Sequence, residues 1–163
     1  MNRNEIQSFS WADMDLLDRR VAKMIKSDRF LPELIVGILR CGMVSAVHLA
    51  YLLSVGLVRG LHVRTTPSDD ILVEKVIEPV VESDEVLNIA RAKKILIVDA
   101  VMASGTTMAL SIRAIQAFAP KEVRTAVIVD WSSSPYKCRS GTRPSIDYIG
   151  TTADKWPEFP WEH

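Results

Sequence analysis

The chain has 163 residues, of which 48% are apolar and 25% are charged, a mixture typical of one globular domain with a substantial core. Its 20 basic residues balance its 20 acidic residues, so the formal net charge is zero. This balance argues against nucleic acid or an anionic membrane surface as the main partner.

The first predicted element is an amphipathic helix that ends near Ser27. Ser10 and Asp13 have the spacing of a capping box, in which two side chains pair with backbone N–H groups at the start of a helix. Apolar residues then recur at three- and four-residue steps, which places them on one face of the helix. These residues are Trp11, Met14, Leu17, Val21 and Met24.

A strand, a second helix and another strand are expected next. The apolar segment 33–39 predicts a short buried strand, which Pro32 separates from the first helix. The second helix is expected to begin at Gly42 and to end at Gly56, since glycine often follows the last turn of a helix. Residues 60–66 predict the next strand.

An acidic arm follows at residues 67–88. Apolar residues alternate over 71–83 and predict two strands, but Pro79 interrupts the pattern. One interpretation of segment 66–88 is a flap that closes over a site, and the other is a disordered segment without function.

The second half of the chain again alternates strands and helices. Residues 93–100 are the clearest buried strand, and 105–119 predict a helix that Pro120 ends. A strand at 122–131, a polar loop and a last strand at 146–150 complete the pattern. The alternation predicts an α/β fold, with a parallel sheet covered on both faces by helices.

We expect one domain over residues 1–163, because no repeat, low-complexity segment or linker divides the sequence. The acidic arm and the two chain ends are expected to form a small lid. The two cysteines, Cys41 and Cys138, are far apart and lack metal-ligand spacing, which favours a reduced cytoplasmic setting. Residues 43–57 are apolar but too short and too interrupted for the ~20 residues of a membrane span.

Two turns lie where a parallel sheet binds ligands, at the carboxyl ends of strands. They are residues 39–42 and 103–107, and the second has the stronger chemistry. Small residues there allow a tight turn, three hydroxyl groups add donors, and the following helix supplies unpaired N–H groups. The turn could hold a phosphate, or it could be an ordinary helix cap. It is no P-loop, because it lacks Gly-Lys-Ser/Thr.

These segments resemble the type I phosphoribosyltransferase family. "ILIVDAVMASGTT" resembles its signature for the 5′-phosphate of phosphoribosyl pyrophosphate, and "IVGILRCGMVSAVHLA" resembles its pyrophosphate loop. "DKWPEFPWE" and the opening "SWADMDLL" are similar to segments of the bacterial and archaeal xanthine-guanine branch. The resemblance covers nearly the whole chain, and it implies a Rossmann-like parallel sheet flanked by helices with a small hood or flap.

The resemblance implies a role for each loop. The residues implied to hold the 5′-phosphate are Ala103, Ser104, Gly105, Thr106 and Thr107. The residues implied to hold pyrophosphate are Leu39, Arg40, Cys41 and Gly42. In the family the peptide bond entering the basic residue of the pyrophosphate loop is often cis, and here that bond is Leu39–Arg40.

Asp99 and Arg40 are the implied catalytic residues, with Asp99 accepting hydrogen bonds from the ribose hydroxyls. Mg²⁺ is the implied cofactor, bound mostly through pyrophosphate and ribose oxygens and water, with direct contact to Asp99 left open. In the branch with the matching C-terminal segment a tryptophan flanks the purine, which implies that Trp156 stacks on the nucleobase. Asp130 and Trp131 occupy the region of further base contacts.

Three departures from the purine members concern the site. Ala100 replaces one of two neighbouring acids, and Ala103 replaces the aspartate proposed as the base for the purine proton. No lysine lies in "VIVDWSSSP", near the end of the strand at 122–131, where purine members use a lysine to contact the exocyclic oxygen of the purine. "DAVMASG" is closer to uracil phosphoribosyltransferases, but their glycine-rich uracil loop is absent.

The resemblance therefore implies an enzyme, and leaves alternatives. The expected reaction transfers a phosphoribosyl group to a purine of the guanine, xanthine or hypoxanthine type, in a homodimer. The alternatives are an impaired or inactive regulatory module, or an enzyme for uracil or a non-standard base. Cys41 adds a further alternative, a reactive thiolate of lowered pKa beside Arg40. Basic residues at 91–94 and 136–143 are explained as solvated loops rather than as a nucleic-acid site.

Overall fold

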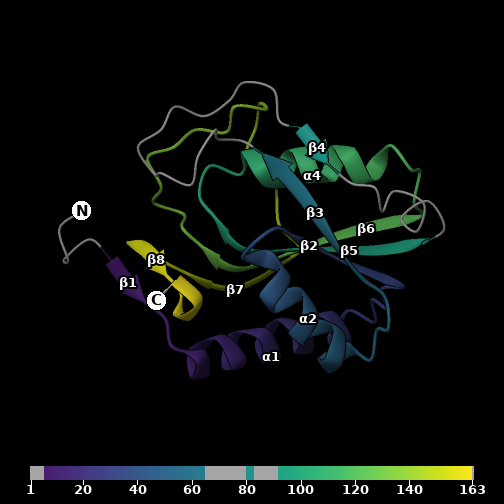
Figure 1. Ribbon diagram of the computed structural model, residues 1–163, viewed down its shortest axis with the longest axis horizontal. Helices are drawn as coiled ribbons and strands as arrows, with labels where there is room; N and C mark the ends of the chain where they lie inside the picture. The colour runs from purple at the N-terminus through teal and green to yellow at the C-terminus, as the bar shows by residue number, and fades with distance from the viewer. Residues whose placement is uncertain (1–5, 65–79, 83–91, 163) are drawn as a thin grey trace.

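A computed structural model describes residues 6–64, 80–82 and 92–162. Its centre is a six-stranded sheet in the order β4-β3-β2-β5-β6-β7 (Figure 1). The strands are β2 (Leu34–Ile38), β3 (Val58–Arg64), β4 (Val80–Glu82), β5 (Lys94–Met102), β6 (Glu122–Asp130) and β7 (Tyr148–Thr152). Neighbours are parallel except for the edge strand β4, which is antiparallel to β3. The predicted α/β fold with a parallel sheet is confirmed.

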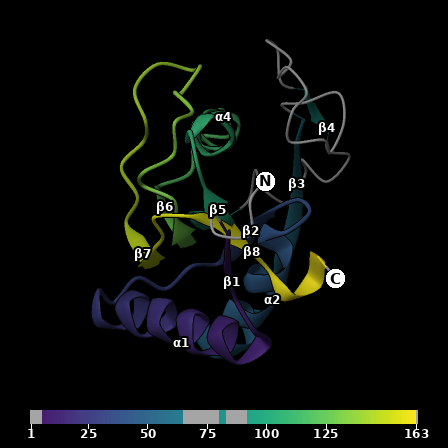
Figure 2. The same ribbon diagram turned by 90° about the vertical axis from the view of Figure 1, so that its left-hand side faces the viewer.

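Helices cover both faces of this sheet. The helices α1 (Trp11–Ser27) and α2 (Gly42–Leu53) lie on one face, and α4 (Thr106–Gln116) lies on the other (Figure 2). Successive side chains of β5 point to opposite faces of the sheet. Leu96 and Val98 pack toward α1 and α2. Ile95 and Ile97 pack toward α4. Burial on both faces explains why the strands read as continuous apolar runs.

The first helix agrees with its prediction at both ends. The hydroxyl of Ser10 accepts the Asp13 N–H at 3.2 Å, and the Asp13 carboxylate accepts the Ser10 N–H at 2.8 Å. Met14 is buried with most of the predicted apolar face, but Trp11 is 59% exposed and lies outside the core. The Trp11 ring instead contacts that of Trp161, with centroids 5.8 Å apart.

The second and third helices end earlier than predicted. Helix α2 stops at Leu53 because Ser54 adopts a left-handed conformation with φ of 58°, so the prediction of Gly56 as its end was wrong. Helix α4 stops at Gln116, and Ala119, which was expected inside it, also has a positive φ of 51°. Strands β3 and β7 are displaced slightly from their predicted ranges. Among the described residues, no helix is long and apolar enough to cross a membrane.

The two ends of the described chain meet in a second, smaller sheet. Strand β1 (Ile6–Ser8) runs parallel to β8 (Trp156–Glu158), and a short 3-10 helix η2 (Pro160–Glu162) follows. These strands were not predicted, and the small lid expected from the acidic arm and the two chain ends stays a prediction, because most of the arm lies outside the described residues. Figure 1 shows this small sheet at one end of the main sheet. Apart from β4, the predicted flap at 66–88 lies outside the described residues.

Gly37 lies where α2 packs directly on the backbone of β2. A Cβ atom at this position would lie 2.8 Å from the Ala46 Cβ and 2.8 Å from the Met43 Cα. Both distances are shorter than ordinary van der Waals contact, so a larger residue would push the helix away from the strand. This close packing fixes where α2 begins, and with it the turn that precedes the helix.

We expect Gly37→Ala to destabilise the protein by about 1–3 kcal/mol, since overpacking of a core costs this much. Urea unfolding of the purified variant measures the change. Gly56→Ala is the matched control, because nothing lies within 4 Å of the Cβ it would add. Equal stability of the Gly37→Ala and Gly56→Ala variants would contradict the packing argument.

Candidate active site

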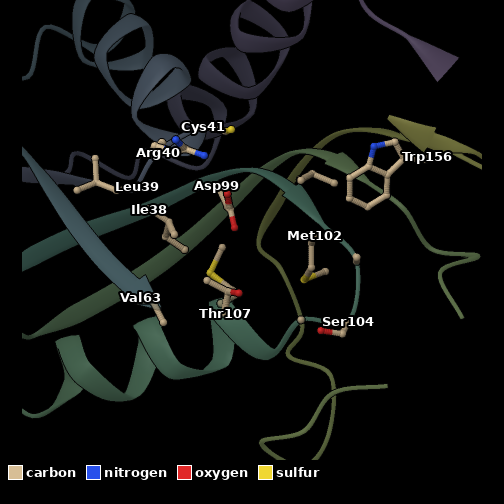
Figure 3. Close-up of a pocket in the computed structure, with 14 residues that line it drawn as sticks. Ile38, Leu39, Arg40, Cys41, Val63, Asp99, Met102, Ser104, Thr107 and Trp156 are labelled. Atoms are coloured by element: carbon tan, nitrogen blue, oxygen red, sulfur yellow. The ribbon is translucent and has the colours of Figure 1, made fainter. Parts of the chain in front are cut away.

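A cavity of about 270 Å³ lies beyond the carboxyl ends of β2 and β5 (Figure 3). These strands are neighbours, but the helices that follow them cover opposite faces of the sheet. Such a switch point leaves a crevice in which α/β proteins bind ligands. Most of the site residues predicted from sequence line this cavity: Leu39, Arg40, Cys41, Asp99, Ala103, Ser104, Gly105, Thr107 and Trp156.

The turn between β2 and α2 forms one wall of the cavity. The Leu39–Arg40 peptide bond is cis, as the family resemblance predicted. Cys41 has φ of −65° and ψ of −37°, so this position needs no left-handed backbone and accommodates a side chain. Burial raises the pKa of the Cys41 thiol, which contradicts the alternative of a reactive thiolate.

Gly42 does not line the cavity, but it sets the distance between two of its walls. A Cβ atom at this position would lie 2.7 Å from the Val98 carbonyl oxygen and 3.3 Å from Oδ1 of Asp99. Only glycine allows α2 to begin so close to the end of β5. The family resemblance placed Gly42 in the pyrophosphate loop, and the structure adds this contact with the neighbouring strand.

Asp99 points into the cavity from β5, between Arg40 and Thr107 in the view of Figure 3. Its carboxylate accepts the N–H of Ala100 at 2.8 Å. Burial raises the pKa of Asp99 to about 7, and the backbone hydrogen bonds from Ala100 and Val101 oppose this rise only in part. The described residues contain no cluster of three or more acids, histidines or cysteines that could hold a metal ion.

The turn between β5 and α4 forms the opposite wall. Gly105 has φ of 81°, a left-handed conformation that favours glycine, and a Cβ there would lie 2.8 Å from Cδ of Pro144. The Ser104 hydroxyl accepts the N–H of Thr106 at 3.2 Å and donates to the Thr106 hydroxyl at 3.0 Å. The helix begins directly after this turn, so its first N–H groups and the positive end of its dipole lie at the cavity.

Thr106 is the member of this turn that does not line the cavity. Its side chain is buried, and its hydroxyl accepts the backbone N–H of Arg139 at 3.0 Å. The hydroxyl therefore ties the turn to the long connection between β6 and β7. No sequence pattern indicated that one of the three hydroxyls in this turn faces away from the ligand site.

Trp156 lines the cavity from the small sheet and has an aromatic support behind it. The Trp131 ring meets the Trp156 ring edge to face, with centroids 5.2 Å apart and planes at 87°. Trp131 itself is buried and does not line the cavity. Trp161 stacks on Phe159 with centroids 4.8 Å apart, so it packs the tail onto the core.

Asp130 also lies outside the cavity lining. It is buried at the end of β6, and its carboxylate forms an ion pair with Arg143. Arg143 was not among the residues predicted from sequence. A buried carboxylate requires a positively charged or hydrogen-bonding partner. Asp130 at the end of an apolar strand therefore indicated that such a partner exists. It did not indicate which of several arginines would be the partner.

A model of the phosphoribosyl transferase domain family matches residues 14–162. The chain belongs to this family. It is thus an enzyme of the phosphoribosyltransferase class, and the match spans both walls of the cavity and Trp156.

Solved structures similar to this phosphoribosyltransferase share its fold at low identity. A purine phosphoribosyltransferase from Pyrococcus horikoshii is 21% identical with a TM-score of 0.73, covering 98% of this chain and 95% of the other. A hypothetical protein from Neisseria gonorrhoeae with bound ppGpp is 23% identical with a TM-score of 0.79, at 98% and 90% coverage. The Helicobacter pylori xanthine-guanine-hypoxanthine phosphoribosyltransferase is 19% identical with a TM-score of 0.68, at 96% and 93% coverage. No curated protein matches the chain.

The raised pKa of Asp99 predicts how the stability of the phosphoribosyltransferase depends on pH. Between the unfolded pKa of ~3.9 and the folded value of about 7, the folded state binds the extra proton, so wild-type stability falls as pH rises through this window. Asp99→Asn removes the titrating carboxyl group and with it this fall in stability at higher pH. The variant is therefore expected to gain stability over wild type from acidic pH upward, with the full difference reached above the folded pKa.

Urea unfolding at about pH 4, 6 and 8 measures this difference. Asp13→Asn is the control: hydrogen bonds from Ser10 lower the pKa of Asp13, so its titration affects stability below the unfolded pKa of ~3.9, and its difference from wild type is expected to stay nearly constant over this pH range. A constant offset between wild type and Asp99→Asn at all three pH values would rule out the raised pKa.

Proposed function

We propose that this single-domain phosphoribosyltransferase transfers the phosphoribosyl group of phosphoribosyl pyrophosphate to a 6-oxopurine such as guanine, xanthine or hypoxanthine. The observation that carries the proposal is one cavity lined by Arg40, Asp99, the turn at 103–107 and Trp156. These groups match the parts of the substrates in order: pyrophosphate, ribose, 5′-phosphate and base.

Each of the two turns receives a different phosphate group of the substrate. The turn at 103–107 and the start of α4 present backbone N–H groups and the hydroxyls of Ser104 and Thr107 to the 5′-phosphate. The turn at 39–42 receives the pyrophosphate, where the guanidinium of Arg40 supplies a permanent positive charge.

Asp99 accepts hydrogen bonds from the ribose hydroxyls in its ionised form. As the bond from C1 to pyrophosphate breaks, positive charge develops on the ribose, and the pyrophosphate oxygen takes the electron pair. A base nitrogen then bonds to C1 with its electron pair, and the proton that this nitrogen carried passes to water, because Ala103 stands where purine members have the proposed base. Arg40 stabilises the leaving pyrophosphate, and the groups that line the cavity orient the reactants.

Mg²⁺ fits this site as part of the substrate. The cavity offers the single carboxylate of Asp99, and Mg²⁺ commonly binds one or two carboxylates together with phosphate oxygens and water. Such an ion supplies charge neutralisation for the pyrophosphate.

The purine assignment rests on Trp156 and on the relatives. The Trp156 ring, held edge to face against Trp131, is suited to stack on a base. The relatives from Pyrococcus horikoshii and Helicobacter pylori are described as acting on purines. Because Asp130 is paired with Arg143, we assign recognition of the base edge to the main chain that follows Trp156.

A second candidate is a binding module for a guanosine nucleotide. The Neisseria gonorrhoeae relative contains bound ppGpp, which carries phosphates on two sides of its ribose. The two turns and Trp156 could hold such a ligand without catalysis, and Ala100 and Ala103 remove acids that purine members use. Pyrophosphate release separates the two candidates.

We also propose that the enzyme is a cytoplasmic homodimer. Val44, Val47 and Tyr51 form an apolar stripe on the outer face of α2, and they are 36%, 40% and 82% exposed. Both cysteines are free thiols, as expected in a reducing compartment. Light scattering of the purified chain measures its mass in solution.

The test is release of pyrophosphate from phosphoribosyl pyrophosphate and Mg²⁺ with guanine, xanthine, hypoxanthine, adenine or uracil. Release with a 6-oxopurine is expected. Release with uracil or adenine alone would replace the purine assignment, and release with none of the bases, with tight binding of ppGpp, would favour the binding module.

Asp99→Asn and Arg40→Ala are expected to lower kcat/KM by at least about 10²-fold, because each removes a charge that acts on the transition state. Thermal unfolding checks that both variants are folded. Undiminished turnover in both would exclude this cavity as the active site.

Trp156→Ala is expected to raise the KM for the base roughly 5- to 150-fold, since stacking of a base on an aromatic ring contributes about 1–3 kcal/mol. The KM for phosphoribosyl pyrophosphate should change little. Trp161→Phe is the matched control, because Trp161 packs on Phe159 outside the cavity lining. Equal effects of the two substitutions would argue against stacking on Trp156.

A further inference from the structure

The side chain of Arg143 lies behind the turn that faces the cavity. Its Nε donates to the carbonyl oxygen of Ala103 at 3.3 Å, and its Nη2 donates to the carbonyl oxygen of Met102 at 3.3 Å. The other side of the guanidinium pairs with the carboxylate of Asp130. One planar group thus connects the end of β6 with two successive peptide groups of the turn.

These contacts help to fix which way the backbone N–H groups of the turn point, together with the Trp131 N–H, which donates to the same Met102 carbonyl oxygen at 3.1 Å. In a planar trans peptide the C=O and N–H bonds point in opposite directions. Carbonyl groups of Met102 and Ala103 that face Arg143 therefore direct the N–H groups of Ala103 and Ser104 away from it. Ala103 and Ser104 both line the cavity, so their donors are directed toward the ligand site.

Asp130 keeps the guanidinium in place. Its side chain is only 8% exposed, so its charge requires the partner that Arg143 provides. The planar fork of arginine can serve the carboxylate and two carbonyl groups together, whereas the single ammonium group of lysine cannot reproduce this geometry.

The surrounding contacts hold the same two segments together. A Cβ atom on Gly105 would lie 3.0 Å from Cγ of Arg143, so the turn rests directly on this side chain. The Arg139 N–H donates to Thr106 at 3.0 Å, next to the same turn. The connection between β6 and β7 is therefore a support for the turn.

We propose that Arg143 is a positioning residue for phosphate binding: it orients the backbone donors of the 103–107 turn that receive the 5′-phosphate. Asp130 acts through Arg143 and does not contact the base. The inference rests on the proposed function of this cavity as a site for phosphoribosyl pyrophosphate.

The experiment measures binding of ribose 5-phosphate by calorimetry, together with kcat and both KM values, for Arg143→Gln and Arg143→Lys. Misaligned donors are expected to weaken ribose 5-phosphate binding about 10- to 100-fold and to raise the KM for phosphoribosyl pyrophosphate, with the KM for the base unchanged. The lysine variant should recover only a small part of this loss.

Arg113→Gln is the matched control. Arg113 donates to the carbonyl oxygen of Ser140 at 2.8 Å, so it braces the same connection at a point away from the 103–107 turn, and its loss is expected to leave binding unchanged. The double variant Asp130→Asn with Arg143→Gln removes both charges, so it tests the role of the fork without a buried unpaired carboxylate. It is expected to bind ribose 5-phosphate as weakly as Arg143→Gln.

Wild-type affinity for ribose 5-phosphate in the folded double variant would overturn the inference. An equal loss in Arg113→Gln would also overturn it, because the effect would then belong to the connection as a whole. If wild type itself fails to bind ribose 5-phosphate, the proposed function fails as well. Binding by wild type with no change in the variants contradicts the role of Arg143 alone.

Discussion

The close approach between the start of α2 and the end of β5 is the constraint on which the site depends. Gly42 permits it, since a Cβ atom would lie 2.7 Å from the Val98 carbonyl oxygen. Gly37 on β2 supports the same close approach, because the absence of a Cβ atom there lets Met43 and Ala46 of α2 rest on the backbone of β2. Because two main-chain contacts set this spacing, the wall that carries Arg40 and the strand that carries Asp99 keep a fixed separation whatever side chains line the cavity.

The opposite wall is held by polar contacts and by side chains that pack closely against Gly105. The turn at 103–107 rests on Arg143, on the Thr106 hydroxyl bond to Arg139 and on Pro144 against Gly105. Trp156 comes from a third part of the fold, the small sheet, and rests against Trp131. Each part of the cavity is thus supported by residues that do not line it, which is how a site on loops gains a defined geometry.

The parts of the structure that follow from local or periodic patterns could be predicted from sequence, including the Ser10 cap of α1 and the buried strands of the sheet. The left-handed Ser54 could not, because this C-terminal position with its bond from the Val55 N–H to the Ala50 carbonyl oxygen usually carries glycine, and serine gives no such indication. The strands β1 and β8 are three residues each, too short to show a period. Most of the cavity lining followed from family motifs, whereas Arg143 lies on an irregular connection, where no spacing rule relates it to Asp130.

The pairing of β1 with β8 has a consequence for how the protein is made. A ribosome releases the N-terminal part of a chain first, yet Ile6 can pair with Trp156 only after all the residues between them have been translated. The main sheet has all its strands by Thr152, so it can assemble while β1 still lacks a neighbour. Pairing of β1 with β8 joins segments that are far apart in the sequence, and Trp156 on β8 lines the cavity. The aromatic side of the site therefore forms only after β8 has been translated, later than the turns at 39–42 and 103–107.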